Sequence, residues 1–280
     1  MLPVRAVALT SLAMLAFAGN SLLCRLALAH TAIDPAGFTA IRLLSGAVML
    51  SLAVRLRGGP WAGHGNWISA LALFAYAIAF SFAYVGLSAA TGALLLFGAV
   101  QATMIGVGIR RGERLHAAQL AGLALAVAGL VTLLLPGLTA PPAGRAALML
   151  GAGVAWGVYS LRGQGAGEAT AVNAGNFLRA VPVALLLCLL LPQPASTDLA
   201  GVGYAVASGA LASGVGYAIW YAALPSLRST TAAVVQLSVP ALAALGGALL
   251  LGEPITARVV LASVTILGGI AIVVLGRRRA

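Results

Sequence analysis

Apolar residues form ten long stretches along the chain, separated by short breaks rich in glycine, proline and charge. A helix needs about 20 predominantly apolar residues to cross the hydrocarbon core of a bilayer, and each stretch is close to that length. The pattern therefore predicts ten membrane-spanning helices. The expected spans are residues 5–28, 35–55, 67–87, 91–109, 117–136, 145–162, 170–192, 200–223, 230–251 and 257–275.

The ninth stretch resembles the fourth. Each is followed by a Gly-Glu pair, at Gly112-Glu113 and at Gly252-Glu253. Gln236 and Pro240 interrupt the ninth stretch, and Gln101 lies in the fourth almost where Pro240 lies in the ninth. A lone amide or a missing backbone hydrogen bond inside a bilayer needs compensation from neighbouring groups. The likeness indicates two copies of one membrane unit.

Composition supports a membrane protein, because 61% of the residues are hydrophobic and only 8% are charged. The net charge of +11 could suggest a nucleic-acid partner, but the arginines fall singly or in short runs between apolar spans. Eleven lie at the connections on one side and three on the other, which is typical of membrane topology. We therefore expect no nucleic-acid partner and a multi-pass protein of the bacterial inner (plasma) membrane with both termini cytoplasmic.

The second half of the chain repeats landmarks of the first half in the same order. Arg179 follows Arg42, and Tyr217 follows Phe80, each at an offset of 137 positions. The first stretch could also be a signal peptide, but it has a counterpart at the start of the second half, which favours a span. We expect two repeats of five spans each, residues 1–140 and 141–280.

Five spans per repeat is an odd number, so the second repeat must enter the membrane from the opposite side. The sequence thus predicts an all-α membrane protein with ten transmembrane helices in two inverted five-helix repeats. In transporters with this architecture the substrate site lies near the midplane, between the repeats.

Two motifs add a family resemblance. The second span opens with Phe38-Thr39-Ala40-Ile41-Arg42, and Pro240 precedes Gly252-Glu253-Pro254 in the ninth. With ten spans in two units, the whole chain resembles the EamA family of the drug/metabolite transporter superfamily, and within it the YddG-type exporters of aromatic and other neutral amino acids. The resemblance implies export of small organic solutes. Gln101 departs from the family pattern, in which a proline is usual at this place.

Aromatic and amide side chains recur at helical spacing in several spans, which places them on shared faces. A cavity with aromatic walls and a few amides suits a neutral amphipathic solute. The alternative is ordinary helix packing for the aromatics, with an interfacial belt for Tyr84, Tyr204 and Tyr221, and interhelical hydrogen bonds for the amides. The predicted substrate-binding residues are Phe17, Asn20, Tyr76, Phe80, Phe97, Gln101, Trp156, Tyr159, Tyr217 and Gln236.

Arg42 and Arg179 lie within predicted spans, where a charge should face an aqueous cavity or a partner. They could bind a substrate carboxylate, or they could bind backbone carbonyls between the repeats and hold the fold. Because each repeat has one, the structural role is favoured. Arg42 is close enough to the outer end of its span to snorkel, whereas Arg179 lies deeper. Pro240 is assigned with them to a structural or gating role.

None of the five acidic residues is expected at mid-span: Asp34, Glu113, Glu168, Asp198 and Glu253. A symporter usually needs an ionisable group inside the membrane, so the pattern favours facilitated diffusion or exchange. Glu113 and Glu253 are expected to cap helix ends or to pair with Arg110, Arg114 or Arg258. The cysteines and histidines show no metal-binding spacing, and no nucleophile motif or phosphate-binding loop is present. We therefore expect neither an enzyme nor a cofactor.

Together these features predict an exporter of neutral amino acids, chiefly aromatic and other apolar ones, that works by alternating access without ion coupling. One rival is an exporter of hydrophobic drugs or metabolites. Another is a non-transporting membrane scaffold subunit. The expected partners are a small-molecule substrate and the lipid bilayer, and the protein is expected to be a monomer or a homodimer.

Overall fold

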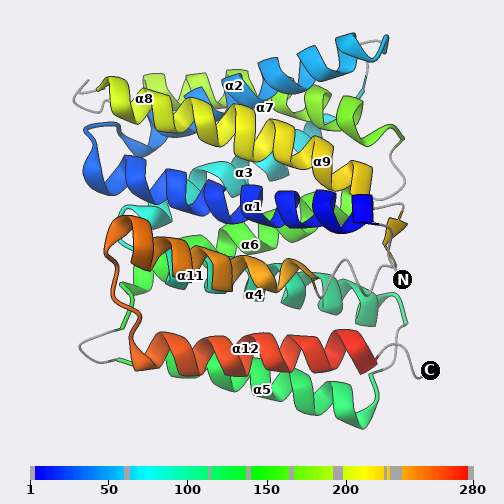
Figure 1. Ribbon diagram of the computed structural model, residues 1–280, viewed down its shortest axis with the longest axis vertical. Coiled ribbons are helices and arrows are strands. Elements are labelled where there is room, and N and C mark those ends of the chain that lie inside the picture. Colours follow the sequence, from blue (N-terminus) through cyan, green and yellow to red (C-terminus); the bar gives the residue numbers. More distant parts are fainter. Residues whose placement is uncertain are drawn as a thin grey trace.

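The computed structural model describes residues 4–59, 64–112, 115–136, 140–163, 167–191, 198–223, 226–227 and 235–276. In these ranges the regular structure is helical, and the long helices lie side by side in one bundle (Figure 1). The first half supplies α1 (Val4–His30), α2 (Pro35–Leu56), α3 (Trp67–Tyr84), α4 (Ala89–Arg110) and α5 (Ala117–Leu134). The second half supplies α6 (Ala143–Gly163), α7 (Ala169–Leu190), α8 (Leu199–Val206), the π-helix η1 (Ala207–Val215), α9 (Gly216–Ala223), α11 (Ser238–Leu251) and α12 (Ala257–Gly276).

The described helices match the ten predicted spans, since α8, η1 and α9 follow one another without a break and form a single span. Eight spans in the described ranges are long and apolar enough to cross a membrane. The other two are α6, which carries an arginine near each end, and α11, which has 14 residues. The predicted all-α membrane fold is thus confirmed.

We call the end of the bundle where α1 begins and α12 ends the predicted cytoplasmic end, and the opposite end the predicted outer end. Figure 1 shows that the start of α1 and the end of α12 lie on the same side of the bundle. The structure contains no membrane, so the assignment of the two sides stays a prediction from the arginine distribution.

Several helices have an acidic residue as their N-cap. Asp34 accepts hydrogen bonds from the first turn of α2, Glu168 from that of α7, and Asp198 from that of α8. A carboxylate at this position satisfies backbone N–H groups that have no partner within the helix. Partial burial of Glu168 opposes its ionisation, but hydrogen bonds from Ala171 and Thr170 hold the pKa of its carboxyl below the usual value.

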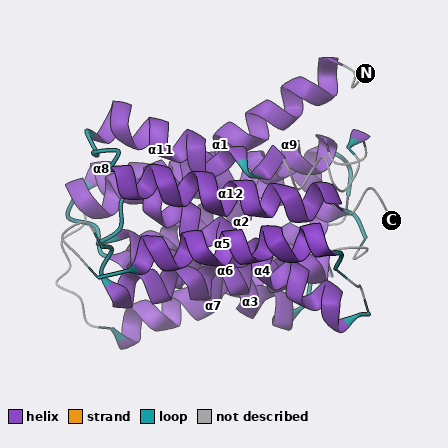
Figure 2. Ribbon diagram, turned by 90° about the horizontal axis from the view of Figure 1, so that it is seen from below, coloured by secondary structure: helices purple, strands orange, loops and turns teal. Residues whose placement is uncertain are grey.

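Helices α5 and α12 pack against each other at one edge of the bundle, and Figure 2 shows them side by side. Glycine permits this close approach: a Cβ on Gly269 would lie 2.4 Å from the carbonyl oxygen of Gly122. Elsewhere α1 packs against the span of α8, η1 and α9, while α6 packs against α3. These contacts are what two inverted repeats would make, but the boundary between residues 1–140 and 141–280 stays a prediction.

The helix break near Pro240 falls just before α11. Residues 235–236 are helical, Leu237 leaves the helix, and α11 begins at Ser238 with Pro240 in its first turn. A proline cannot donate to the carbonyl four residues earlier, here that of Gln236, and its ring crowds that carbonyl. The gating role of Pro240 stays a prediction, and the first part of the expected ninth span lies outside the described residues.

Candidate functional site

Arg42 of α2 is buried in the middle of the bundle, with only 2% of its surface exposed. Its Nη2 donates a hydrogen bond of 2.9 Å to the hydroxyl of Tyr76. The guanidinium carbon also lies 5.2 Å from the ring centroid of Tyr76 and 5.0 Å from that of Phe80. Its Nε and Nη1 are buried without a hydrogen-bond partner in the described structure. The centre of the bundle therefore holds a cation with unused N–H groups.

A chain of polar contacts joins this arginine to two other spans. Asn20 of α1 donates from Nδ2 to the Tyr76 hydroxyl at 3.2 Å, and its Oδ1 accepts from the hydroxyl of Ser208 at 2.7 Å. Ser208 belongs to η1, and its neighbour Gly209 lets η1 approach α2 closely. A Cβ on Gly209 would lie 2.1 Å from the carbonyl oxygen of Arg42. The arginine, amide and hydroxyls are thus held by α1, α2, α3 and η1 together.

The π-helix itself was missed by sequence reasoning. π-helical turns are rare in proteins, and those that exist are frequently found at functional sites. The sequence from Gly209 to Gly216 is rich in small residues, which favour close helix packing, but it carries no signal for the wider helical turn.

Several of the predicted aromatic residues meet around Trp156 of α6. Its ring centroid lies 4.8 Å from that of Tyr76, 5.5 Å from that of Tyr159 and 5.3 Å from that of Tyr217. Phe17 extends the contacts to α1, with its centroid 5.9 Å from that of Tyr217. Helices from both halves of the chain therefore contribute to one group. We call it the aromatic cluster: Phe17, Tyr76, Phe80, Trp156, Tyr159 and Tyr217.

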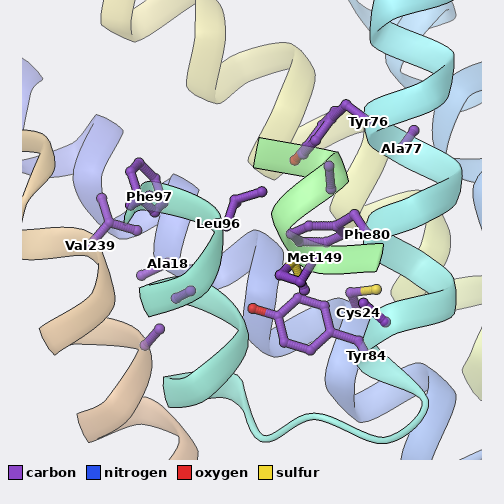
Figure 3. Close-up of a cluster of buried hydrophobic side chains, with 14 of the residues drawn as sticks. Ala18, Cys24, Tyr76, Ala77, Phe80, Tyr84, Leu96, Phe97, Met149 and Val239 are labelled. Carbon is purple, nitrogen blue, oxygen red and sulfur yellow. The ribbon is translucent and has the colours of Figure 1, made fainter. Parts of the chain in front are cut away.

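The aromatic residues of α3 stack along one face, as their spacing predicted. Figure 3 shows Phe80 between Tyr76 and Tyr84. The Phe80 ring centroid lies 5.3 Å from that of Tyr76 and 4.7 Å from that of Tyr84. Tyr84 is fully buried, so the alternative of a lipid-facing belt was wrong for this residue. Gly92 allows this burial, because a Cβ there would lie 2.4 Å from the Tyr84 ring.

Three predicted site residues do not join the aromatic cluster. Phe97 is buried beside Val239 of α11, apart from the stack on α3 (Figure 3). Gln101 is also buried, and Gln236 is half-buried. Neither amide makes a hydrogen bond within the part of the chain that the structure describes. A role for these residues in substrate binding stays a prediction.

Two amides of α7 belong near the site and were missed. Tyr159 donates from its hydroxyl to Oδ1 of Asn173, and Asn176 donates from Nδ2 to the Tyr159 hydroxyl at 3.4 Å. Oδ1 of Asn176 accepts from the backbone N–H of Asn66 at 2.9 Å. The signal was available, since two asparagines three residues apart share a helix face in an otherwise apolar span.

The two arginines within spans behave differently. Arg179 lies further from the end of its helix, as expected, but Arg42 is the more buried of the two. Arg42 does not snorkel, whereas Arg179 is only partly buried and donates from Nη1 to the carbonyl oxygens of His64, at 2.6 Å, and Gly175, at 2.8 Å. The backbone at His64 crosses α7 so closely that a Cβ on Gly175 would lie 1.9 Å from the His64 oxygen. This crossing gives Arg179 carbonyl acceptors, an arrangement that fits a structural role.

At the predicted outer end, Glu253 links three parts of the bundle. Its Oε1 lies 2.8 Å from Nε of Arg25, and its Oε2 accepts a 2.7 Å hydrogen bond from the N–H of Ala89, the first residue of α4. Arg25 also donates to the carbonyl oxygen of Tyr84 at 3.0 Å. We call these contacts of Arg25, Glu253 and Ala89 the outer latch. Gly252 supports it, because its φ of 64° ends α11 and turns Glu253 back toward the bundle.

The expected capping role of Glu253 agrees with this geometry, but the expected partner Arg258 was wrong. Arg258 instead donates to the carbonyl oxygen of Leu135 at 2.6 Å, and Arg145 donates to that of Phe82 at 2.6 Å. Each arginine at the predicted outer end thus binds carbonyls near a helix C-terminus, where a cation is favoured. Glu113 and its expected ion pair lie outside the described residues.

Within the described residues, no group of three or more His, Cys, Asp or Glu could hold a metal ion. The geometry offers a buried cation, hydroxyls, an amide and aromatic rings between helices of both halves. Such a combination can bind a small amphipathic molecule. A polytopic membrane protein with this centre belongs to the class of small-solute transporters.

Comparisons with known proteins agree with this class. The profile of the EamA-like transporter family matches residues 145–275. The chain is 58% identical over 274 residues to "Uncharacterized protein PA1977" of Pseudomonas aeruginosa, covering 98% of this chain and 96% of that protein. A crystal structure at 21% identity superposes with a TM-score of 0.70 and covers 98% of this chain and 99% of the other, which shows the same fold. The chain belongs to the EamA-like transporter family and is a membrane transporter, not an enzyme.

Proposed function

We propose that this transporter exports neutral amino acids, chiefly aromatic and other apolar ones, by alternating access. The observation that carries the proposal is the aromatic cluster, in which Tyr76 of α3 meets Trp156 of α6 and Tyr217 of α9. Aromatic walls suit an apolar side chain, and ring faces also attract an ammonium group. Asn20 and the Tyr76 hydroxyl stand beside these rings and can orient a polar group.

Alternating access needs an end that closes, and the contacts of the outer latch support a closed state of the predicted outer end. The latch joins α1 to the start of α4 and to the segment after α11, so these two polar contacts must break before the three elements can separate at this end. Helices α5 and α12 pack backbone to backbone, and in this proposal they form the edge of the bundle that does not move during transport. We call this pair the static edge. The movable walls are α3, α4, the span of α8 to α9, and α11.

The proposal includes no ion-coupling carboxylate. The acidic residues in the described ranges cap helices or belong to the outer latch. Proton- and sodium-coupled carriers usually hold such a group at depth in the membrane. Transport is therefore expected to follow the substrate gradient, as facilitated diffusion or exchange.

The test is uptake of labelled phenylalanine by purified protein in liposomes, with and without a proton gradient. We expect flux without the gradient. Replacing Trp156 with Ala should lower the flux by about twofold to twelvefold, because an aromatic contact contributes about 0.5–1.5 kcal/mol beyond the area it buries. Trp67→Ala is the matched control, since Trp67 is 55% exposed at the start of α3.

Three results would count against the proposal. Flux that requires a proton gradient would refute the uncoupled mechanism. Efflux of apolar drugs without amino-acid flux would favour the drug-exporter alternative. No flux of either compound from a folded protein would favour a scaffold role.

A further inference from the structure

We infer that Arg42 recognises the carboxylate of the transported molecule, so that a free carboxylate is required for binding and an amino group is not. The inference rests on the proposed transport function but goes further. It names aromatic and apolar monocarboxylates as the substrate class, with the neutral amino acids as one part of it.

The first support is the set of unused donors on Arg42. Its Nη2 binds the Tyr76 hydroxyl, while Nε and Nη1 are buried without an acceptor in the described structure. Buried polar atoms nearly always have hydrogen-bond partners, and each missing partner is costly. A carboxylate can accept from one of these groups and from the second hydrogen of Nη2 at the same time, in the two-point geometry that arginine favours.

The second support is the absence of a compensating charge among the described neighbours. The guanidinium lies against the rings of Tyr76 and Phe80, and the Cys24 thiol and the Tyr217 hydroxyl are close enough to interact with it electrostatically. Asn20 binds the same Tyr76 hydroxyl as Arg42. None of them carries a negative charge. Arg179 shows the contrast, because it has the carbonyl oxygens of His64 and Gly175 as acceptors. A buried cation is normally paired, so Arg42 is suited to an anion that comes and goes.

The third support is position. Arg42 and Asn20 bind the same Tyr76 hydroxyl, and the Tyr76 ring centroid is 4.8 Å from that of Trp156. A carboxylate on Arg42 therefore brings the attached apolar group to the aromatic cluster. The described residues around this point offer an ammonium group ring faces and hydroxyls but no carboxylate. The site thus selects for the acid group more strongly than for the amine.

The rival explanation is that Arg42 only braces Tyr76. If Arg42 only positions Tyr76, ligand binding should not depend on the charge of the ligand. If Arg42 is the anchor that binds the carboxylate, acids should bind more tightly than amines. Four ligands with one aromatic body distinguish the two: phenylalanine, 3-phenylpropionate, phenylalaninamide and 2-phenylethylamine. Binding is measured on the full-length purified protein at pH 7 by quenching of tryptophan fluorescence.

We expect phenylalanine and 3-phenylpropionate to bind at least tenfold more tightly than the two amines. Arg42→Gln should remove this preference, lowering the affinity for both acids at least tenfold. Arg179→Gln is the matched control and should keep the preference. Should Arg42→Gln fail to fold, Arg42→Lys keeps the charge but loses the planar donor geometry, and it should weaken acid binding severalfold.

An unchanged preference in a folded Arg42 variant, or equal binding of acids and amines by the wild-type protein, overturns the inference. The two proposals can fail separately. Phenylalanine flux that survives Arg42→Gln would refute the anchor but not the transport function. Arg42-dependent binding of 3-phenylpropionate without phenylalanine flux would refute the amino-acid function but not the anchor.

Discussion

Replacing Gly209 with Ala should destabilise the protein by forcing η1 away from α2. The added Cβ would lie 2.1 Å from the carbonyl oxygen of Arg42, and also 2.1 Å from Oγ of Ser45. The serine hydroxyl can rotate, but the carbonyl belongs to the backbone of α2. Ordinary contact begins at 3.4 Å, so the two backbones would have to separate locally by about 1.3 Å, the difference between these distances.

The magnitude follows from two opposing effects. Overpacking a tight contact costs about 1–3 kcal/mol. Alanine gains up to about 1 kcal/mol over glycine in a helix interior. If Gly203→Ala makes the same gain, the loss relative to that variant is the overpacking cost of about 1–3 kcal/mol, which corresponds to a midpoint of thermal unfolding about 2–12 °C lower. Because Arg42 moves with its carbonyl, phenylalanine flux should fall as well.

The assay is thermal unfolding of the purified protein in detergent. Gly203→Ala provides the control in the same span, because a Cβ on Gly203 would meet nothing within 4 Å. Gly203→Ala should leave the midpoint unchanged or raise it slightly. If Gly209→Ala matches Gly203→Ala in stability, the close contact between η1 and α2 does not exist, and the account of how Arg42 is positioned is wrong.

Two further predictions concern the outer latch and the static edge. Arg25→Gln removes the ion pair with Glu253, so the neighbouring buried Cys24 should react with maleimide severalfold faster in a background where Cys188 is replaced by Ser; an unchanged rate would contradict the latch. Gly269→Ala places a Cβ 2.4 Å from the backbone oxygen of Gly122 and should lower the thermal midpoint by several degrees, whereas Gly268→Ala, with nothing within 4 Å, should not. Equal midpoints for the two glycine variants would argue against backbone contact between α5 and α12.

Sequence reasoning succeeded where a local rule acts on consecutive residues. Nine spans were predicted within a few residues, and the described part of the ninth falls inside its predicted range, because the bilayer requires a fixed length of apolar helix. The face shared by Tyr76 and Phe80 followed from the helical repeat. The position of Trp156 among those rings could not be derived, because it depends on how α6 packs against α3.

The polar centre shows the limit most clearly. Sequence reasoning identified Arg42 and Arg179 as unusual and favoured a structural role for both, because each repeat has one. Asn173 and Asn176 were passed over, although they share one face of an otherwise apolar span. Similar segments can therefore have different roles, depending on which distant backbone lies beside them.

The sequence by itself determined the number and length of the helices, the faces that carry aromatic side chains and the placement of the acidic residues in connections. Those properties depend on the spacing of residues along one helix and on the free-energy cost of placing polar groups in lipid. Only the tertiary structure decided that Arg179 reaches the carbonyl of His64, that Glu253 pairs with Arg25, and that two nitrogens of Arg42 have no acceptor among the described residues. These outcomes depend on contacts between residues that are far apart in the chain, and the spacing of residues along one helix carries no information about them.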